Sequence, residues 1–423
     1  MAEAKLIVRS KQPLYIGKRK VLSRFMETED QIPGSRIRAA LALKLLEECK
    51  APEFKENHAD CPQKENCPFW VLIGNDFKNG VRFTDARPSL GNEFSYPTLS
   101  TMKTCKVYPG FKADRDDEEK HGVLDIAIPS IVTEELKDTL IILYYQKCFE
   151  CGEEAKPYTK TFIMEEEKKS SKDLRTKKHS LTSVGIDRNT ETQREGFLYS
   201  LDVINQRTEF VGRVFGTDGE VLLLEEKIKE INGTLFLGGE RSSGYGRAQV
   251  EIKRGLLTKD SFMKEGLKER IEEFNEKAKE IWSEFEVFSQ AAKKPQGIYF
   301  TVDFISKAFL KNSLGEPVVV LKGEELKSIL IQNGFTEVPE IELVRAFSSP
   351  EYFIGWSTAW GLPKPSGLAT KGGSVMIYKT EDITDELLQA LEYLEKEGLG
   401  ERKEEGFGEV VICHPFHREV LPV

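Results

Sequence analysis

The chain has 423 residues, of which 39% are hydrophobic and 31% charged, and its formal net charge is −9. This length predicts two or three soluble domains, and no apolar run approaches the ~20 residues that span a bilayer, so no membrane association is expected. The net charge argues against bulk, non-specific DNA binding but allows a local basic face. The seven cysteines lack a dense disulfide pattern, and no signal-peptide segment opens the chain, which predicts a cytoplasmic protein.

The N-terminal region is predicted to alternate regular and irregular segments. Residues 5–17 alternate enough to form a strand, and Ser35 is a good N-cap for a helix over residues 39–48. Residues 50–70 are polar and contain Pro and Cys, so we expect an irregular insertion there. Residues 105–195 are too long for a simple connection, and we expect a second, elaborated and partly mobile insertion.

The following segments are predicted with clearer periodicity. A helix over residues 220–231 and a strand over 234–237 lead into a glycine-rich loop. Residues 259–287 carry apolar side chains at three- and four-residue spacing, which predicts an amphipathic helix packed on a domain. From residue 297 the order is strand, helix, strand, helix, strand. This order is typical of an antiparallel sheet with helices on one face, of the ferredoxin-like kind.

Two glycine-rich segments repeat one another. Residues 239–246 read GERSSGYG, residues 400–408 read GERKEEGFG, and each runs into a β-branched stretch. Because an internal repeat implies two copies of one unit, we predict an α+β fold with two ferredoxin-like (RRM-like) domains. Each domain is expected to end in a Gly-rich loop, and the first to carry a Cys-containing insertion. The expected boundaries are 1–255 for the first domain, 256–296 for an amphipathic helical linker and 297–423 for the second domain.

Loops of this kind can bind anions, since successive bare N–H groups form a concavity and a neighbouring Arg donates to phosphate. A tight turn without a ligand is the alternative. The spacing fits neither a dinucleotide-binding loop nor a Walker loop, so no nucleotide cofactor is expected. Four glutamates surround Arg402 in the second loop, whereas Arg241 and Arg247 in the first have only Glu240 nearby. The first loop is therefore the better candidate for phosphate, and the second for protein contacts or folding.

The cysteines predict a zinc site. Cys148 and Cys151 form a C-x-x-C pair followed by Gly, which is the commonest zinc half-site. Free thiols are one alternative, and a redox pair is another that no surrounding βαβ pattern supports. The favoured ligand set is Cys105, His121, Cys148 and Cys151, and the rival set joins Cys61 and Cys67 to Cys148 and Cys151.

Catalytic groups are sparse in the sequence. His179 lies in a basic stretch, with no Ser, Cys or carboxylate partner at a readable spacing. A surface histidine is the simpler interpretation, and no enzymatic activity is expected. The runner-up interpretation makes His179 the general base of an RNA-cleaving site.

Several of these segments resemble the RAMP superfamily of CRISPR proteins. The similarity covers most of the chain except the 256–296 helix, although Ile73-Gly74 stands where the family has Phe-Gly. The Cys-bearing insertions make the chain most similar to the two-domain type III-D effector subunit that holds the five-prime handle of the crRNA. The segments that carry the resemblance are Ile32-Pro33-Gly34-Ser35 with Arg38, Val81 to Ala86, His179 with residues 185–199, both glycine loops, and residues 355–375.

The resemblance implies a non-catalytic crRNA-binding subunit of a type III effector in antiviral defence. Its expected partners are crRNA, the large polymerase-like subunit and the backbone RAMP subunits. The alternatives are a metal-independent endoribonuclease that processes CRISPR repeat RNA and a scaffold that touches only protein. The expected RNA-binding residues are Arg36, Arg38, His179, Arg188, Gly239, Arg241, Gly244, Tyr245, Gly246, Arg247, Gly400, Arg402, Gly406, Phe407 and Gly408.

Overall fold

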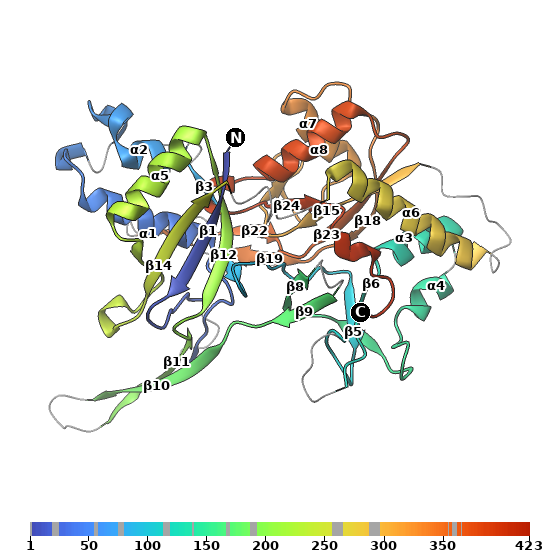
Figure 1. Cartoon of the computed structure of the whole chain (residues 1–423), viewed down its shortest axis with the longest axis horizontal. Helices are drawn as coiled ribbons and strands as arrows, with labels where there is room; N and C mark the ends of the chain where they lie inside the picture. The colour runs from blue at the N-terminus through green and yellow to red at the C-terminus, as the bar shows by residue number, and fades with distance from the viewer. Residues whose placement is uncertain are drawn as a thin grey trace.

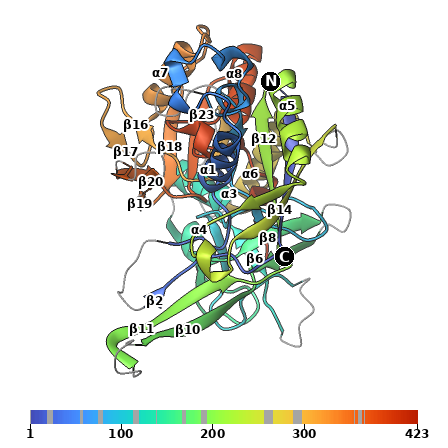
Figure 2. The same cartoon turned by 90° about the vertical axis from the view of Figure 1, so that its left-hand side faces the viewer.

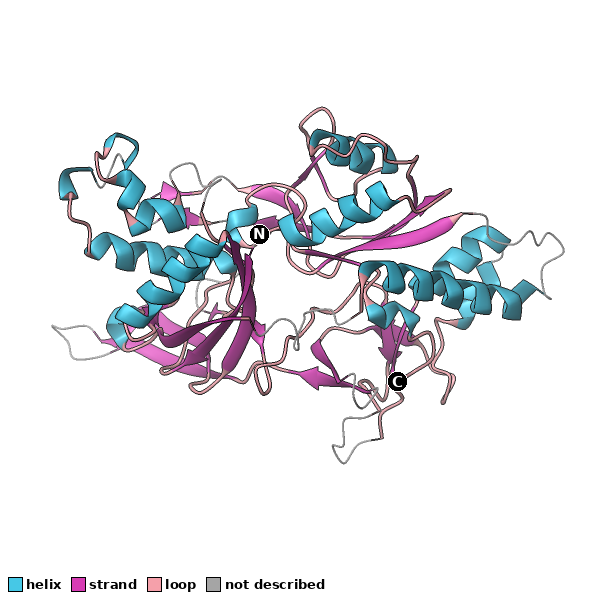
Figure 3. Cartoon of the chain, turned by 45° about the horizontal axis from the view of Figure 1, so that its top comes forward, coloured by secondary structure: helices cyan, strands magenta, loops and turns pink. Residues whose placement is uncertain are grey.

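The computed structural model contains two antiparallel sheets that lie side by side, with helices over one face of each (Figures 1 and 3). The structure describes residues 2–18, 25–54, 58–74, 80–112, 119–137, 139–165, 170–186, 193–255, 265–286, 297–353, 355–357, 362–364 and 366–423. The predicted α+β class with antiparallel sheets is confirmed. No helix in these ranges is long and apolar enough to cross a membrane.

The first sheet has the order β13-β14-β1-β12-β3, and β4 also pairs with β12. Its long central strand β1 (Ala2–Ser10) pairs with β12 (Glu209–Gly216) and β14 (Arg247–Arg254), so distant parts of the chain meet there. The other strands are β3 (Arg82–Phe83), β4 (Arg87–Pro88) and β13 (Thr234–Phe236), and the helices are α1 (Gly34–Glu47), α2 (Pro68–Ile73) and α5 (Asp218–Glu230).

Two expectations about the first unit need correction. The strand expected over residues 5–17 is β1, and it ends at Ser10. Helix α1 begins at Gly34, with Pro33 as its N-cap, so Ser35 lies inside the helix. The Asp85 carboxylate accepts from the Gly34 N–H at 3.0 Å and so satisfies the first turn in place of Ser35. Close packing requires glycine there, because a Cβ would lie 2.1 Å from the Phe83 carbonyl oxygen. Helix α5 agrees with the prediction, and Thr217 caps it in a capping box with Glu220.

The second sheet has the order β18-β23-β15-β24. Its strands are β15 (Ile298–Phe304), β18 (Glu342–Phe347), β23 (Val375–Thr380) and β24 (Val410–Ile412), and its helices are α6 (Leu267–Phe285), α7 (Gly323–Gln332) and α8 (Asp385–Glu397). Short strands complete the unit: β16 (Leu310–Lys311), β17 (Pro317–Val318), β19 (Pro350–Phe353), β20 (Trp356–Ser357), β21 (Leu362–Pro363) and β22 (Gly367–Thr370). The predicted apolar stripe of α6 is buried, as at Ile271 and Phe274.

The large insertion is more regular than expected. It forms β5 (Met102–Cys105), β6 (Val123–Asp125), β7 (Ala155–Pro157), β8 (Thr161–Glu165), β9 (Ser170–Leu174), α3 (Ala127–Leu136) and α4 (Thr139–Tyr144). This segment is rich in charged residues, so its sequence does not reveal that some of its apolar residues belong to the core. Phe162, for example, is fully buried. Strands β10 (Lys178–Ile186) and β11 (Gln193–Ile204) extend from the body as an arm, with β2 (Phe25–Met26) alongside β11 (Figures 1 and 2).

The insertion shares one hydrophobic core with the second sheet and α6. A buried histidine adds a polar link between them: His417 Nδ1 and Nε2 each lie 3.0 Å from a carboxylate oxygen, of Asp125 and Asp303 respectively. Burial alone would lower the pKa of His417, but the two carboxylates raise it to about 10. His417 is therefore charged at neutral pH. The domain boundaries given above stay a prediction.

Candidate nucleic-acid interface and metal centre

The first glycine loop connects β13 to β14 and is held against residues 13–15. The N–H groups of Gly239 and Gly246 donate to the carbonyls of Tyr15 and Pro13, both at 3.0 Å. Gly238 has φ +83°, and a Cβ there would lie 2.1 Å from the Tyr15 carbonyl oxygen. The backbone therefore requires glycine here, and the segment from Arg241 to Gly244 is pushed outward as an exposed turn.

The polar side chains of this loop face solvent. Arg241 and Arg247 are exposed, and Tyr245 is half-buried. The Arg241 Nε donates to the Gly238 carbonyl at 3.2 Å, which aligns the guanidinium along the loop. Arg36 is exposed at the start of α1. Burial and the Glu240 carboxylate raise the pKa of Tyr15, and the positive charge of Arg36 lies close enough to oppose that rise. Arg36 and the first loop are thus neighbours.

A cluster of cations lies beside this loop, and sequence reasoning missed two of its members, Lys11 and Arg207. The backbone N–H of Lys11 donates to the Arg247 carbonyl at 2.9 Å, and that of Arg207 donates to the Ser10 carbonyl at 2.8 Å. The carbonyl of Lys177 accepts from Asn205, also at 2.9 Å. The side chains of Lys11, Lys177, Arg207 and Arg247 are all exposed, and among the described residues no carboxylate pairs with them. We call these four residues the edge cluster.

His179 lies at the base of the arm, next to the edge cluster. Its Nδ1 is 2.6 Å from Asn205 Oδ1, and its side chain is exposed. In the described part of the chain no carboxylate or second imidazole bonds to it. Arg188, which was also expected to bind RNA, lies outside the described residues.

The second glycine loop has a similar backbone but opposite surroundings. Arg402 has φ +58° where Glu240 has +56°, and Gly406 has +92° where Gly244 has +87°. However, the Arg402 guanidinium lies 4.9–5.2 Å from the ring centroids of Phe309, Phe353 and Phe407, and pairs with Glu405 at 2.7 Å. Gly406 and Phe407 are buried, as is Gly408, whereas Gly400 is half-buried.

This second loop packs into the first unit. A Cβ at Gly406 would meet the Phe83 carbonyl oxygen at 2.7 Å and Gly34 Cα at 3.3 Å. Arg38 belongs to the same contact, since its side chain is only 5% exposed and its guanidinium donates to the Ile73 carbonyl. Burial lowers the pKa of Arg38, and Glu404 and Glu405 oppose that shift. Arg38 and Arg402 thus face the protein interior in this structure, and their predicted RNA contacts stay predictions.

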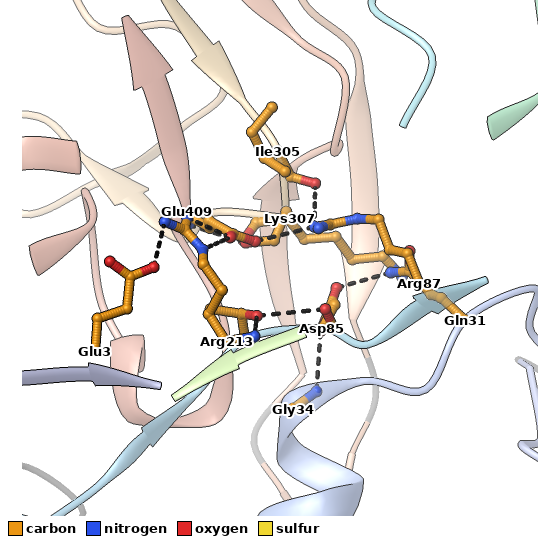
Figure 4. A network of polar contacts seen from close by, with 11 residues as sticks. Glu3, Gln31, Gly34, Asp85, Arg87, Arg213, Ile305, Lys307 and Glu409 are labelled. Carbon is orange, nitrogen blue, oxygen red and sulfur yellow. Dashed lines mark hydrogen bonds and ion pairs between the residues drawn. The ribbon is translucent and has the colours of Figure 1, made fainter. Parts of the chain in front are cut away.

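Glu409, directly after the loop, joins the two units through buried ion pairs (Figure 4). Its Oε1 lies 2.7 Å from Arg213 Nη2 and its Oε2 lies 3.0 Å from Arg87 Nη2, and all three side chains are less than a tenth exposed. Burial raises the pKa of Glu409, but the two guanidinium groups outweigh it and hold that pKa below its usual value. Nearby, burial raises the pKa of Asp85 to about 6, although the Gly34 N–H donates to its carboxylate.

The favoured cysteine and histidine set is brought together by the small sheet β6-β5-β7. Cys105 ends β5, His121 precedes β6, and the Cys148–Cys151 pair precedes β7. Because β5 runs antiparallel to both neighbours, all four residues lie at the same end of the small sheet. The ligand atoms of these four residues lie within 4.8 Å of one another. Cys61 and Cys67 take no part in this cluster and lie in the segment before α2.

The geometry of the cluster suits zinc. Cys105 Sγ and Cys151 Sγ are 3.6 Å apart, and His121 Nδ1 and Cys148 Sγ are 3.3 Å apart. A tetrahedral zinc with Zn–S of about 2.3 Å needs ligand separations of about 3.5–3.8 Å, so small shifts would close the site. Burial acts to raise the pKa of Cys148, but backbone N–H groups and His121 lower it to about 7. For Cys151, a hydrogen bond from the Glu153 backbone acts to lower the pKa, but burial and the neighbouring thiols of Cys148 and Cys105 raise it to about 11. One thiol of the pair therefore gives up its proton readily. His121 Nε2 lies 3.8 Å from Glu150 and can be oriented by it.

Comparison with known proteins gives a family match. The model of the RAMP superfamily matches residues 8–250, more than half of the chain. Among solved structures, the chain resembles one from the Type III-B Cmr-beta bound to cognate target RNA and AMPPnP (11% identity, 95% of this chain and 94% of that chain, TM-score 0.43). It also resembles one from the Type III-B Cmr-beta bound to cognate target RNA (10% identity, 96% of both chains, TM-score 0.40) and one from a Type IV-B CRISPR complex (10% identity, 59% of this chain and 90% of that chain, TM-score 0.30). The comparison with curated proteins gives no match.

Proposed function

Since the chain belongs to the RAMP superfamily, we propose that it is a non-catalytic crRNA-binding subunit of a type III CRISPR ribonucleoprotein effector. The finer assignment, to a type III-D-like subunit that holds the five-prime handle and contacts the large and backbone subunits, rests on the order of its sequence motifs. Both units are then ferredoxin-like domains. In support, the orders β14-β1-β12-β3 and β24-β15-β23-β18 each place the fourth, first, third and second core strands side by side.

The observation that carries the proposal is the first glycine loop together with the edge cluster. The exposed arginines of this loop suit the phosphates of a single strand, and Tyr245 offers a ring for stacking. The N–H groups of Gly239, Gly244 and Gly246 bond within the protein, so the side chains carry this role. Lys11, Lys177 and Arg207 add cations that form no ion pair within the described part of the chain. Such a local basic face can attract RNA although the whole chain has a net charge of −9.

We predict that Arg241→Ala with Arg247→Ala weakens RNA binding by about tenfold to a hundredfold and lowers its salt slope by about 1.4, because each lost phosphate contact on a single strand contributes about 0.7. Arg402→Ala is the matched control from the other loop. It should leave the salt slope unchanged, since its guanidinium is enclosed by phenylalanine rings. Anisotropy titrations of labelled CRISPR repeat RNA over a range of salt concentrations give both quantities. Equal losses of slope at the two loops would remove the assignment of RNA to the first loop.

We also predict that the protein binds repeat RNA without cutting it, with or without Mg²⁺. Cleavage needs a base near the 2′-hydroxyl and a group that stabilises the phosphorane, and His179 bonds to an amide oxygen rather than to an acid partner. Gel analysis of RNA incubated with wild type and His179→Ala checks this. Discrete products that disappear in His179→Ala, while binding persists, would favour the endoribonuclease. Purified protein that neither carries nor binds RNA would favour a protein-only scaffold.

We infer further that Cys105, His121, Cys148 and Cys151 hold one structural zinc. All four coordination positions come from the protein, and Cys105, His121 and Cys148 are buried, as in closed sites that stabilise a fold. The metal would tie together the three strands of the small sheet.

A further inference from the structure

A cleft with mixed apolar and polar walls lies where the insertion meets the second sheet. It has a volume of about 520 Å³ and is lined by residues 97–100, 157–159, 161, 347–349 and 371–372. We propose that this cleft holds one nucleotide of the RNA strand that leaves the first glycine loop. The inference rests on the proposed function, because it assumes that RNA is bound there.

The chemistry of the lining favours a ribose phosphate. No carboxylate is among the lining residues, and Lys371 is exposed with no acid partner among the described residues. The hydroxyls of Ser100, Thr159, Thr161 and Ser349 have no partner in the described part of the chain, so they are free to bond to sugar and phosphate oxygens. Phe347 supplies an apolar wall. Another cavity, of about 550 Å³, lies between the segment after α7 and the start of α8. Its lining includes the acidic residues Glu337, Asp385 and Glu386, which would repel a phosphate.

The walls of the cleft are held in place. The Ser100 N–H donates to the Gly373 carbonyl at 2.7 Å, and the Lys371 N–H donates to the Ser349 carbonyl at 3.0 Å. Gly373 has φ +90°, and a Cβ there would lie 2.0 Å from the Thr98 carbonyl oxygen, so the two walls are in close contact. The site is therefore preformed, and binding would cost little ordering of the protein.

A line of cations joins this cleft to the edge cluster. Thr161, in the cleft, pairs with Leu174 across the β8–β9 hairpin. The chain then runs through the exposed Arg175 and Lys177 into the arm. Figure 1 shows β8 and β9 between the arm and the second unit, so a strand that leaves the first loop along these cations would arrive at the cleft.

The test uses the full chain with two labelled single-stranded RNAs, a short one that only the first loop and edge cluster can hold and a longer one that also reaches the cleft. Lys371→Gln should weaken binding of the longer RNA about threefold to tenfold and lower its salt slope by about 0.7, with no effect on the short RNA. Ser100→Trp, which fills the cleft without a change in charge, should weaken the longer RNA while keeping its slope. Lys279→Gln, at an exposed lysine on α6, is the control and should change neither.

Unchanged binding of the longer RNA by Lys371→Gln and Ser100→Trp would overturn the cleft assignment. If Arg241→Ala with Arg247→Ala still weakens both RNAs in that case, the proposed function stands without it. Failure of the wild type to bind either RNA would instead remove the proposed function. Free AMP serves as a separate probe: we expect no measurable binding, and AMP binding that Lys371→Gln abolishes would assign the cleft to a free nucleotide and contradict the inference.

Discussion

Replacing Glu409 with Gln should lower the free energy of unfolding by about 3–5 kcal/mol, because it removes the ion-pair partner of the buried Arg87 and leaves the buried Arg213 to its ion pair with Glu3. Glu409 is 3% exposed and pairs with Arg87 and Arg213, which belong to the other sheet. Glu3 can compensate only in part, since it lies 3.2 Å from Arg213 and its side chain is 31% exposed, and the nearby buried Arg82 adds a further positive charge. Chemical denaturation followed by circular dichroism measures the loss.

Glu401→Gln is the matched control in the same loop. Glu401 pairs with Lys311 at 2.6 Å, but both side chains are about half exposed, so its loss should cost less than about 1 kcal/mol.

The pH dependence of the stability adds a second test of the Glu409 ion pairs. Because the folded pKa of Glu409 is below the usual 4.5, its stabilisation is complete above pH 4.5 and is lost as the pH falls through the folded pKa. The acid-induced loss of stability should therefore be smaller in Glu409→Gln than in wild type. Equal stability of Glu409→Gln and wild type at neutral pH would contradict the account.

Removing the metal should produce the second large effect. Zinc at a concentration about a thousandfold above its Kd stabilises the folded state by about 4 kcal/mol, and its removal loses that amount. We expect about one zinc per chain by elemental analysis, and Cys148→Ser should lose both the zinc and this stability. A chelator should lower the melting temperature of the wild type but leave that of Cys148→Ser unchanged.

Cys67→Ser is the control for the zinc site. Cys67 is half-buried and lies outside the cluster, so this variant should keep its zinc. Zinc that is lost in Cys67→Ser and retained in Cys105→Ser would restore the rival ligand set. Freshly purified wild type without any metal would remove the zinc site altogether.

The sequence predicted local features well and long-range neighbours poorly. The C-x-x-C pair is visible because its ligands are three residues apart, but the choice between Cys105 with His121 and Cys61 with Cys67 depends on strand pairing. Cys105 and His121 reach the Cys148–Cys151 pair because β5 lies between β6 and β7 in the small sheet. Lys11 and Arg207 of the edge cluster were missed for the same reason: they meet because β1 pairs with β12 and β14, and no local pattern reports that register.

The two glycine loops illustrate what repetition alone cannot decide. Their sequences repeat the glycines and an arginine, and their backbones have similar positive φ values, but the structure aligns Arg402 with Glu240 rather than with Arg241. The acids around the second loop were the available signal that its surroundings differ, and the assignment of RNA to the first loop stays a prediction. That Arg402 is enclosed by Phe309 and Phe353 could not be predicted, because those residues come from distant strands and loops.

Photocrosslinking of bound repeat RNA, with the attached peptides identified by mass spectrometry, tests most directly whether the first loop holds the RNA. The account predicts crosslinks within residues 239–247, above all at Tyr245, and at the neighbouring Lys11 and Arg207. Crosslinks concentrated within residues 400–408, with none at the first loop, would contradict it.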